Sequence, residues 1–234
     1  MHVHLMVGEP FDFEFERELQ HSMTTHFMLY TNTDSMNLLK LMPDNSKTIL
    51  NTRANFNGLA LIEMQRSSSF VEQTPSAFQK YLLEEKISGI AFDSSSWMKV
   101  TVKEKYSRCI KSLVVCGRND QDHLWNKVMG QRLELVLKVN PYALKDKEPI
   151  AVKLFWNGKP LQGEWIAATI RTQEGNIKEQ SQATDRDGVA VFEVERNAIY
   201  YLHVVHMIKL SNESDADFES VWASYSFLVP GERR

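Results

Sequence analysis

Apolar and polar residues alternate with a period of two along most of this 234-residue chain, a pattern typical of half-buried β-strands. In "PIAVKLFW" one face of the predicted strand is apolar and holds Ile150, Val152, Leu154 and Trp156. The Asn157-Gly158 pair that follows suits the positive φ angles of a tight hairpin turn. The pattern therefore predicts two strands joined by a short turn at this point.

The same alternation recurs toward the end of the chain. In "TDRDGVAVFEV" we expect a turn over 185–188, followed by a strand whose inward face holds Ala190, Phe192 and Val194. The segments "YYLHVVHMI" and "WASYSFLV" predict two further strands that complete an antiparallel set. The fold class predicted is all-β.

One segment departs from this period. "TPSAFQKYLLEEK" predicts a helix over about 75–87, with Thr74 as N-cap and Pro75 at the first helical position. Phe78, Tyr81 and Leu82 share one face of this helix, and Ser88-Gly89 is expected to end it. We expect it to be the only substantial helix and to lie over or beside the first half of the chain.

A domain boundary is predicted in "VNPYALKDKEP", where two prolines and a charged run separate two β-rich halves. The sequence thus predicts two β-sandwich domains. The first, over 1–145, contains the one short helix, and the second covers 146–234.

Composition and charge exclude several classes of partner. A hydrophobic content of 43% suffices for a large core, and the net charge of -3 with scattered Lys and Arg argues against nucleic acid and anionic membranes. The chain has no apolar run of the roughly 18–20 residues that direct membrane insertion requires. If Cys109 and Cys116 share one strand they are about 23 Å apart, too far for a disulfide.

Six motifs, in order, resemble one known family: "AFQKYLLEEKI", "EKYSRCIKSLVVCG", "GQRLELVLKVNPYAL", "VKLFWNGKPLQGEWI", "ATDRDGVAVFEV" and "VWASYSFLVP". Together they span almost the whole chain. The family comprises extracytoplasmic bacterial proteins of unknown function that are related to NikM-like accessory components of nickel and cobalt uptake.

The resemblance implies a periplasmic or secreted protein whose second half is an Ig-like, prealbumin-like or carboxypeptidase-regulatory-like sandwich. Such members begin, once the signal peptide is removed, with a histidine-containing start like "HVH". This implies that Met1 replaces a leader. It also implies a role in metal uptake, with a membrane transporter component as partner; the sequence leaves the oligomeric state open.

The histidines are the candidate metal ligands. His2 and His4 are two residues apart, so on an extended segment both imidazoles point to one side. His203 and His206 are three apart and fall on opposite faces of a regular strand, and His206, near the strand's end, is the stronger candidate. Because nickel, cobalt, copper and zinc all bind neutral imidazole, the sequence predicts a divalent metal held by His2, His4 and His206. The alternative is that His2 and His4 belong to a frayed, functionless terminus, and that His203 and His206 are ordinary hydrogen-bonded, half-buried histidines.

A second candidate site lies in "EKYSRCIK". Glu104, Tyr106 and Arg108 share a strand face, and we interpret them first as a network that joins the two halves. The functional alternative is an anion or carboxylate ligand held by Arg108 and Lys111.

The sequence contains none of the common catalytic motifs, so we predict a binding protein rather than an enzyme. An alternative is an adhesion or scaffold module that binds a protein or glycan through exposed Trp156, Trp165 or Trp222. A third, less favoured, is a hydrolase whose site carries no familiar motif.

Overall fold

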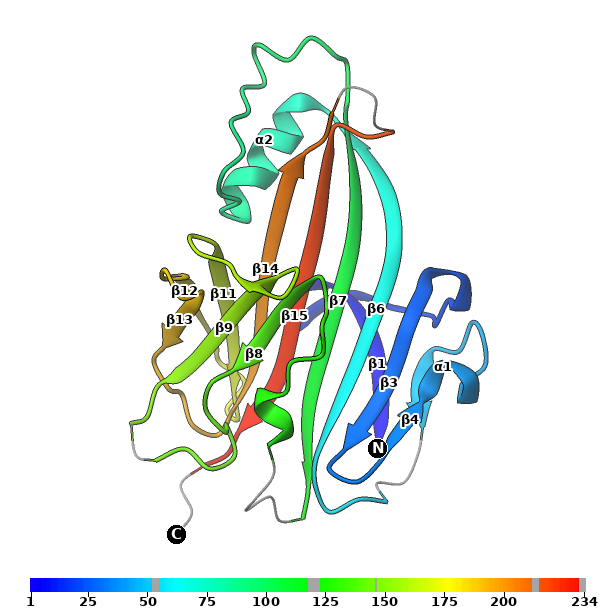
Figure 1. Ribbon diagram of the computed structural model, residues 1–234, viewed down its shortest axis with the longest axis vertical. Helices are drawn as coiled ribbons and strands as arrows, with labels where there is room; N and C mark the ends of the chain where they lie inside the picture. Colours follow the sequence, from blue (N-terminus) through cyan, green and yellow to red (C-terminus); the bar gives the residue numbers. More distant parts are fainter. Residues whose placement is uncertain (52–54, 118–122, 146, 212–214, 232–234) are drawn as a thin grey trace.

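A large antiparallel-rich sheet forms the centre of the computed structural model, which describes residues 1–51, 55–117, 123–145, 147–211 and 215–231 (Figure 1). The eight strands lie in the order β12-β11-β14-β15-β7-β6-β3-β4. Their bounds are β3 (Thr24–Thr31), β4 (Ser35–Asn37), β6 (Gly58–Gln73), β7 (Val102–Cys116), β11 (Trp165–Thr172), β12 (Ile177–Ala183), β14 (Ala198–Lys209) and β15 (Phe218–Val229). The all-β prediction is confirmed.

Side chains alternate between the two faces of this sheet, as the period of two requires. We call the face that carries Leu61 and Leu113 the front face, and the face that carries Ile62 and Arg108 the back face. A smaller layer covers each face. In Figure 1 the front layer lies in front of β14 and β15, and β1 lies behind β6.

The front layer is a four-stranded sheet in which β9 pairs with β8, β10 and β13. Its strands are β8 (Leu133–Leu137), β9 (Ile150–Trp156), β10 (Lys159–Pro160) and β13 (Val189–Phe192). Ile150, Val152 and Leu154 are fully buried, as predicted. Asn157 and Gly158 form the hairpin turn with φ angles of 49° and 74°, which confirms the predicted turn.

The back layer is a three-stranded sheet in the order β2-β1-β5. Its strands are β1 (His2–Glu9), β2 (Asp12–Arg17) and β5 (Thr48–Asn51). Ile49, Leu50 and Val3 from this layer pack against Ile62 and Met64 of β6. The back layer covers only part of the back face. Other elements pack over part of β14 and β15 on this face.

The two halves of the chain share strands and core. β8 and β9 lie on either side of the boundary predicted at 145/146, yet they pair with each other. The closing strand β15 pairs antiparallel with β14 and parallel with β7, so the predicted set of strands is not wholly antiparallel. The front core joins Leu61 and Leu113 to Leu135, Leu154 and other residues of the second half.

The predicted helix is confirmed as α2 (Pro75–Glu84), and the Thr74 side chain accepts a hydrogen bond from the Ala77 amide. It ends before Ser88-Gly89, and its buried Phe78 and Leu82 pack against β14 and β15 rather than the first half alone. The other helices described are α1 (Leu38–Leu41) and the 3-10 turns η1 (His21–Met23) and η2 (Leu124–Asn126). No helix within the described ranges has the length and apolar character to span a membrane.

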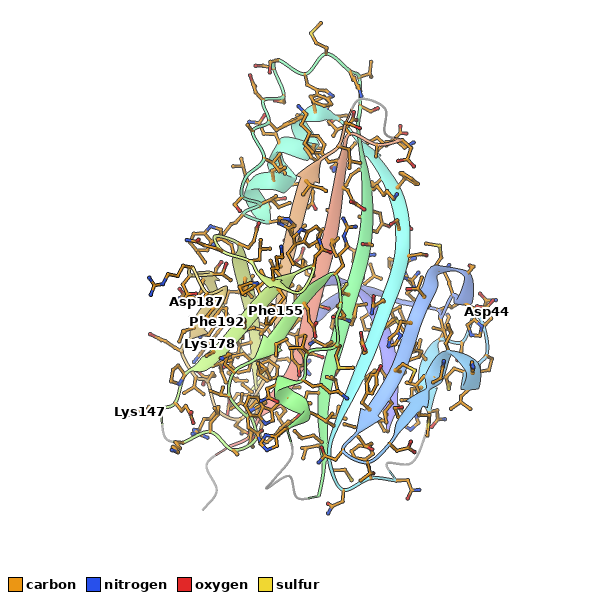
Figure 2. The ribbon with its side chains drawn as sticks, viewed as in Figure 1. Asp44, Lys147, Phe155, Lys178, Asp187 and Phe192 are labelled. Carbon is orange, nitrogen blue, oxygen red and sulfur yellow. The ribbon has the colours of Figure 1, made fainter. Side chains whose placement is uncertain are left out.

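Two local predictions also hold. The carboxylate of Asp185 accepts hydrogen bonds from the amides of Asp187 and Val189, so this acidic segment is a turn on the rim of the molecule. Figure 2 shows Asp187 on the opposite side of the molecule from Asp44. Cys109 and Cys116 both lie on β7 and are unpaired.

Candidate functional site

The histidines predicted to bind metal lie in two separate places. His2 and His4 are exposed on β1, and His4 Nδ1 lies 2.5 Å from Glu16 Oε1 on β2. His206 lies on the front face of the large sheet, where its ring meets that of Trp156 edge-on at 4.4 Å. Because β1 covers the back face, the fold does not bring His206 to the N-terminal pair.

Each histidine of β14 has its own carboxylate partner. His206 Nδ1 lies 2.8 Å from the buried Glu164, and His203 Nε2, on the back face, lies 3.2 Å from Glu85. The prediction that these two histidines face opposite ways is confirmed. Within the part of the chain that the structure describes, no three His, Cys, Asp or Glu side chains gather where they can hold a metal ion.

Arg108 and Lys111 also lie on opposite faces of the sheet, so the predicted anion site between them is wrong. Side chains that are three residues apart along a strand point to opposite faces of the sheet. Lys111 points into the front core, where it donates to Glu134 over 2.8 Å and both side chains are almost completely buried. Burial lowers the pKa of Lys111, and the neighbouring Glu134 opposes this shift.

Arg108 meets two other arginines on the back face. It lies directly opposite Arg66 in the β6–β7 pairing, and Arg17 at the end of β2 lines the same space. Arg66 is only 8% exposed. Its Nη2 donates to Gln20 Oε1 over 2.7 Å, whereas its Nη1 and the Nε of Arg17 are buried and have no hydrogen-bond partner among the residues that the structure describes.

The three guanidinium groups repel one another and have little compensation. Burial, and after it the charges of Arg17 and Arg108, lower the pKa of Arg66, although an arginine stays charged at neutral pH. Among the described residues, none of the three forms an ion pair with Asp or Glu. Glu104 is close enough to feel the charge of Arg108, but its carboxylate accepts hydrogen bonds from Tyr81 and Ser220.

The arginines lie where two cavities meet, between the back layer and the large sheet. The cavities have volumes of about 230 and 440 Å³, and Arg17, Arg66 and Arg108 line both. A β-bulge between Arg66 and Ser69 interrupts the ladder at the smaller cavity. Neither lining includes an Asp or Glu among the described residues. A concave, positively charged site of this kind favours an anion.

Aromatic rings hold the Arg108 side chain in place. The Arg108 Cζ atom lies 5.0 Å from the ring centre of Tyr106 and 5.8 Å from that of Trp222. Trp222 in turn stacks on Tyr81 of α2, with ring centres 5.9 Å apart and an interplanar angle of 8°. Such cation–π contacts orient a guanidinium group without neutralising it.

Sequence reasoning found Arg108 but missed Arg17 and Arg66. A signal for Arg66 exists in "LIEMQR", because Ile62, Met64 and Arg66 share the parity of one buried strand face. A charged residue in that position of an apolar face indicates a special role. Arg17 has no comparable signal, since it reaches the cavity only through the folding of β2 over the sheet.

The tryptophans considered for adhesion do not form one exposed cluster. Trp156 lies against His206 on the front side, and Trp222 lies under α2 on the back face. Trp165, 40% exposed, carries the Lys86 ammonium 4.8 Å from its ring centre. None of the three is fully buried, so the adhesion alternative stays a prediction without a single tryptophan cluster to support it.

Fold and cavity together define a layered all-β protein with an arginine-lined cavity between a large and a small sheet. The chain belongs to the family described as a domain of unknown function, DUF4198, whose model matches residues 1–208. Comparison with curated proteins and with solved structures found no match.

Proposed function

We propose that this protein binds an anionic ligand through Arg17, Arg66 and Arg108 in the cavity behind the large sheet. The observation that carries the proposal is the meeting of three arginines, two of them directly opposite on neighbouring strands, without a carboxylate partner in the described chain. The proposed role is binding and not catalysis.

Charge and hydrogen bonding both support an anion here. Like charges opposite each other destabilise a sheet, and a buried charge without a partner is costly. A carboxylate, phosphate or sulfate group would accept bonds from the unpaired Arg66 Nη1 and Arg17 Nε atoms. The hydroxyl groups of Ser67 and Ser69 line the same cavity and can add neutral donors.

The direct test compares thermal unfolding of the protein in phosphate, sulfate, acetate and chloride at equal ionic strength. A ligand at ten times its Kd stabilises the folded state by about 1.4 kcal/mol, which raises Tm by about 3–6 °C in a chain of this size. We expect such a rise with at least one of the oxyanions, and its loss in Arg66→Met and Arg108→Met.

Arg186→Met is the matched control, because it removes the same charge from a side chain that is 87% exposed and belongs to neither cavity lining. It should keep the full oxyanion effect. Equal responses in the wild type and all three variants would mean that the anions act on the general surface, and would refute the arginine site.

A metal function is a second proposal, and it rests on one observation. His2 and His4 lie on the same side of β1, and Glu16 adds a carboxylate beside His4. Glu16 does not complete a three-ligand cluster with the two histidines in the structure, so the proposed metal is held by the imidazoles of His2 and His4, with water as further ligand. We join to this proposal the extracytoplasmic location, the relation to NikM-like uptake components with a transporter partner, and the prealbumin-like character of the second half, all of which rest on sequence resemblance.

Isothermal titration of metal-stripped protein with nickel, cobalt, copper and zinc tests the metal proposal. We expect saturable binding that is lost when His2 and His4 are both replaced by alanine and kept in His206→Ala. Binding that survives the double replacement, or no binding in the wild type, would refute a site at β1.

A further inference from the structure

The larger cavity combines the arginines with walls that are mainly apolar. Side chains from β1, β6 and β7 form these walls, namely Val3, Leu5, Val7, Ile62, Met64 and Ile110. The register of the sheet places Arg66 and Arg108 in one cross-strand row, and Met64 and Ile110 in the next row of the same face. The charged and apolar parts of the cavity are therefore adjacent and continuous.

The floor of the apolar part is made of small side chains. Ser112 on β7 and Ser226 on β15 lie opposite each other, and the Ser226 hydroxyl donates to the Ser112 oxygen over 2.9 Å. Ser224 lies next to them on the same face. Because these hydroxyl groups are short and two of them satisfy each other, space remains between the floor and the β1–β2 hairpin.

Contacts from the large sheet hold the hairpin over this space. The Cζ atom of Arg171 on β11 lies 4.8 Å from the ring centre of Phe11 at the hairpin's turn. The turn needs a positive φ of 67° at Phe11, and Gly8 has a φ of 124° where a side chain would meet the Glu14 backbone. The hairpin thus forms a roof over the apolar part.

A simple inorganic anion would use only the arginines of such a cavity. Sites for organic ligands are mostly apolar with a few placed polar groups, and a volume near 440 Å³ falls in their range. A hydrocarbon chain that enters the space under the hairpin would exchange its contact with water for contact with apolar side chains.

We propose that the ligand is an acidic amphiphile, with its anionic head group on Arg17, Arg66 and Arg108 and its hydrocarbon chain between the β1–β2 hairpin and the serine floor. This inference rests on the proposed anion site and adds the ligand's apolar body to it. The shared chemistry is an anionic head group on a straight chain, whether the head is a carboxylate or a phosphate ester.

The test is isothermal titration with acetate, hexanoate, decanoate and decyl phosphate, each below its micelle-forming concentration, and with decanol as the uncharged chain. We expect affinity to rise about fourfold for each methylene that becomes buried, until the cavity is full. Decanoate and decyl phosphate should both bind, and the tighter of the two identifies the head group. Decanol should bind at least about tenfold more weakly than the tighter one, because it lacks the charge-assisted hydrogen bonds.

Val7→Trp fills the cavity from the hairpin side and should weaken decanoate binding by about tenfold or more while leaving phosphate binding intact. Val191→Trp is the matched control, because Val191 on β13 is 49% exposed and the variant makes the same change in size. It should bind like the wild type. If circular dichroism shows that Val7→Trp does not fold, Ile199→Trp on the cavity's other wall replaces it.

The outcomes separate the two proposals. Phosphate or acetate binding with no gain from chain length refutes the amphiphile and leaves the anion site standing. Decanoate binding that is equal in the wild type and Val7→Trp also refutes it. Chain-dependent binding that survives Arg66→Met and Arg108→Met refutes the amphiphile's anchor on the arginines, whereas the anion site is refuted only if the oxyanion effect also survives in those variants.

Discussion

Arg66 and Arg108 lie opposite each other on neighbouring strands, where two positive charges repel. Most buried side chains of this protein follow the ordinary rule, with apolar groups inside and charges paired, as Lys111 is with Glu134. The arginine row departs from that rule. Buried charges without partners are retained at binding sites. They lower the stability of the folded protein when the site is empty, and the bound ligand restores that stability.

In buffer without oxyanions, Arg66→Met should raise the free energy of unfolding by about 1 kcal/mol, because it removes a buried charge that two like charges surround and keeps the apolar stem. Chemical denaturation of both proteins measures the difference. Arg186→Met should change stability by no more than about 0.5 kcal/mol. A loss of stability in Arg66→Met would show that contacts within the fold satisfy Arg66.

A charged pair ties the front layer to the large sheet. Arg132, just before β8, donates from both Nη atoms to the two carboxylate oxygens of Glu219 on β15, each over 2.7 Å. These hydrogen bonds, supported by the charge of Arg132, hold the pKa of Glu219 below its usual value of 4.5, against a smaller opposing effect of burial. Bidentate geometry of this kind is stronger than an ordinary surface pair.

The second prediction concerns Glu219→Gln. A depressed carboxyl pKa in the folded state contributes stability above the unfolded value of 4.5, and this contribution disappears as the pH falls through the lower folded value. We expect the variant to lose about 1 kcal/mol near pH 7 and progressively less below pH 4.5. Urea denaturation across this pH range measures the trend. An equal loss at every pH would assign the effect to side-chain shape rather than to charge.

Strands from both halves of the sequence pair within one sheet. The large sheet takes β3, β4, β6 and β7 from the first half and β11, β12, β14 and β15 from the second, and the parallel β7–β15 pair joins them. The front core includes Leu59, Leu61 and Leu113 from the first half. Neither half holds a complete set of strand partners.

The third prediction is that the protein unfolds in one cooperative transition. Far-UV circular dichroism and tryptophan fluorescence should give coincident urea curves, because the halves share a sheet and a core. A fragment of residues 146–234 should remain unfolded, since β15 loses its partner β7 and β9 loses β8. Two separate transitions, or a folded fragment, would establish independent domains.

The strands at 150–156 and 198–209, the helix after Thr74 and the turn at Asn157-Gly158 could all be predicted, because period, capping and turn chemistry are local properties of the sequence. The separation of His203 from His206 followed from the same alternation. The predicted anion site between Arg108 and Lys111 was wrong because it ignored this alternation. Side chains that are three residues apart along a strand point to opposite faces of the sheet.

The sequence by itself determined which elements form and which residues each presents to one side or the other. The tertiary structure alone decided that β6 lies beside β7, that β15 joins β7 in parallel, and that the β1–β2 hairpin covers the back face. Those arrangements bring Arg17, Arg66 and Arg108 together from positions far apart in the chain. The physical reason is that strand order and layer packing are set by the burial of whole apolar faces, which no local pattern specifies.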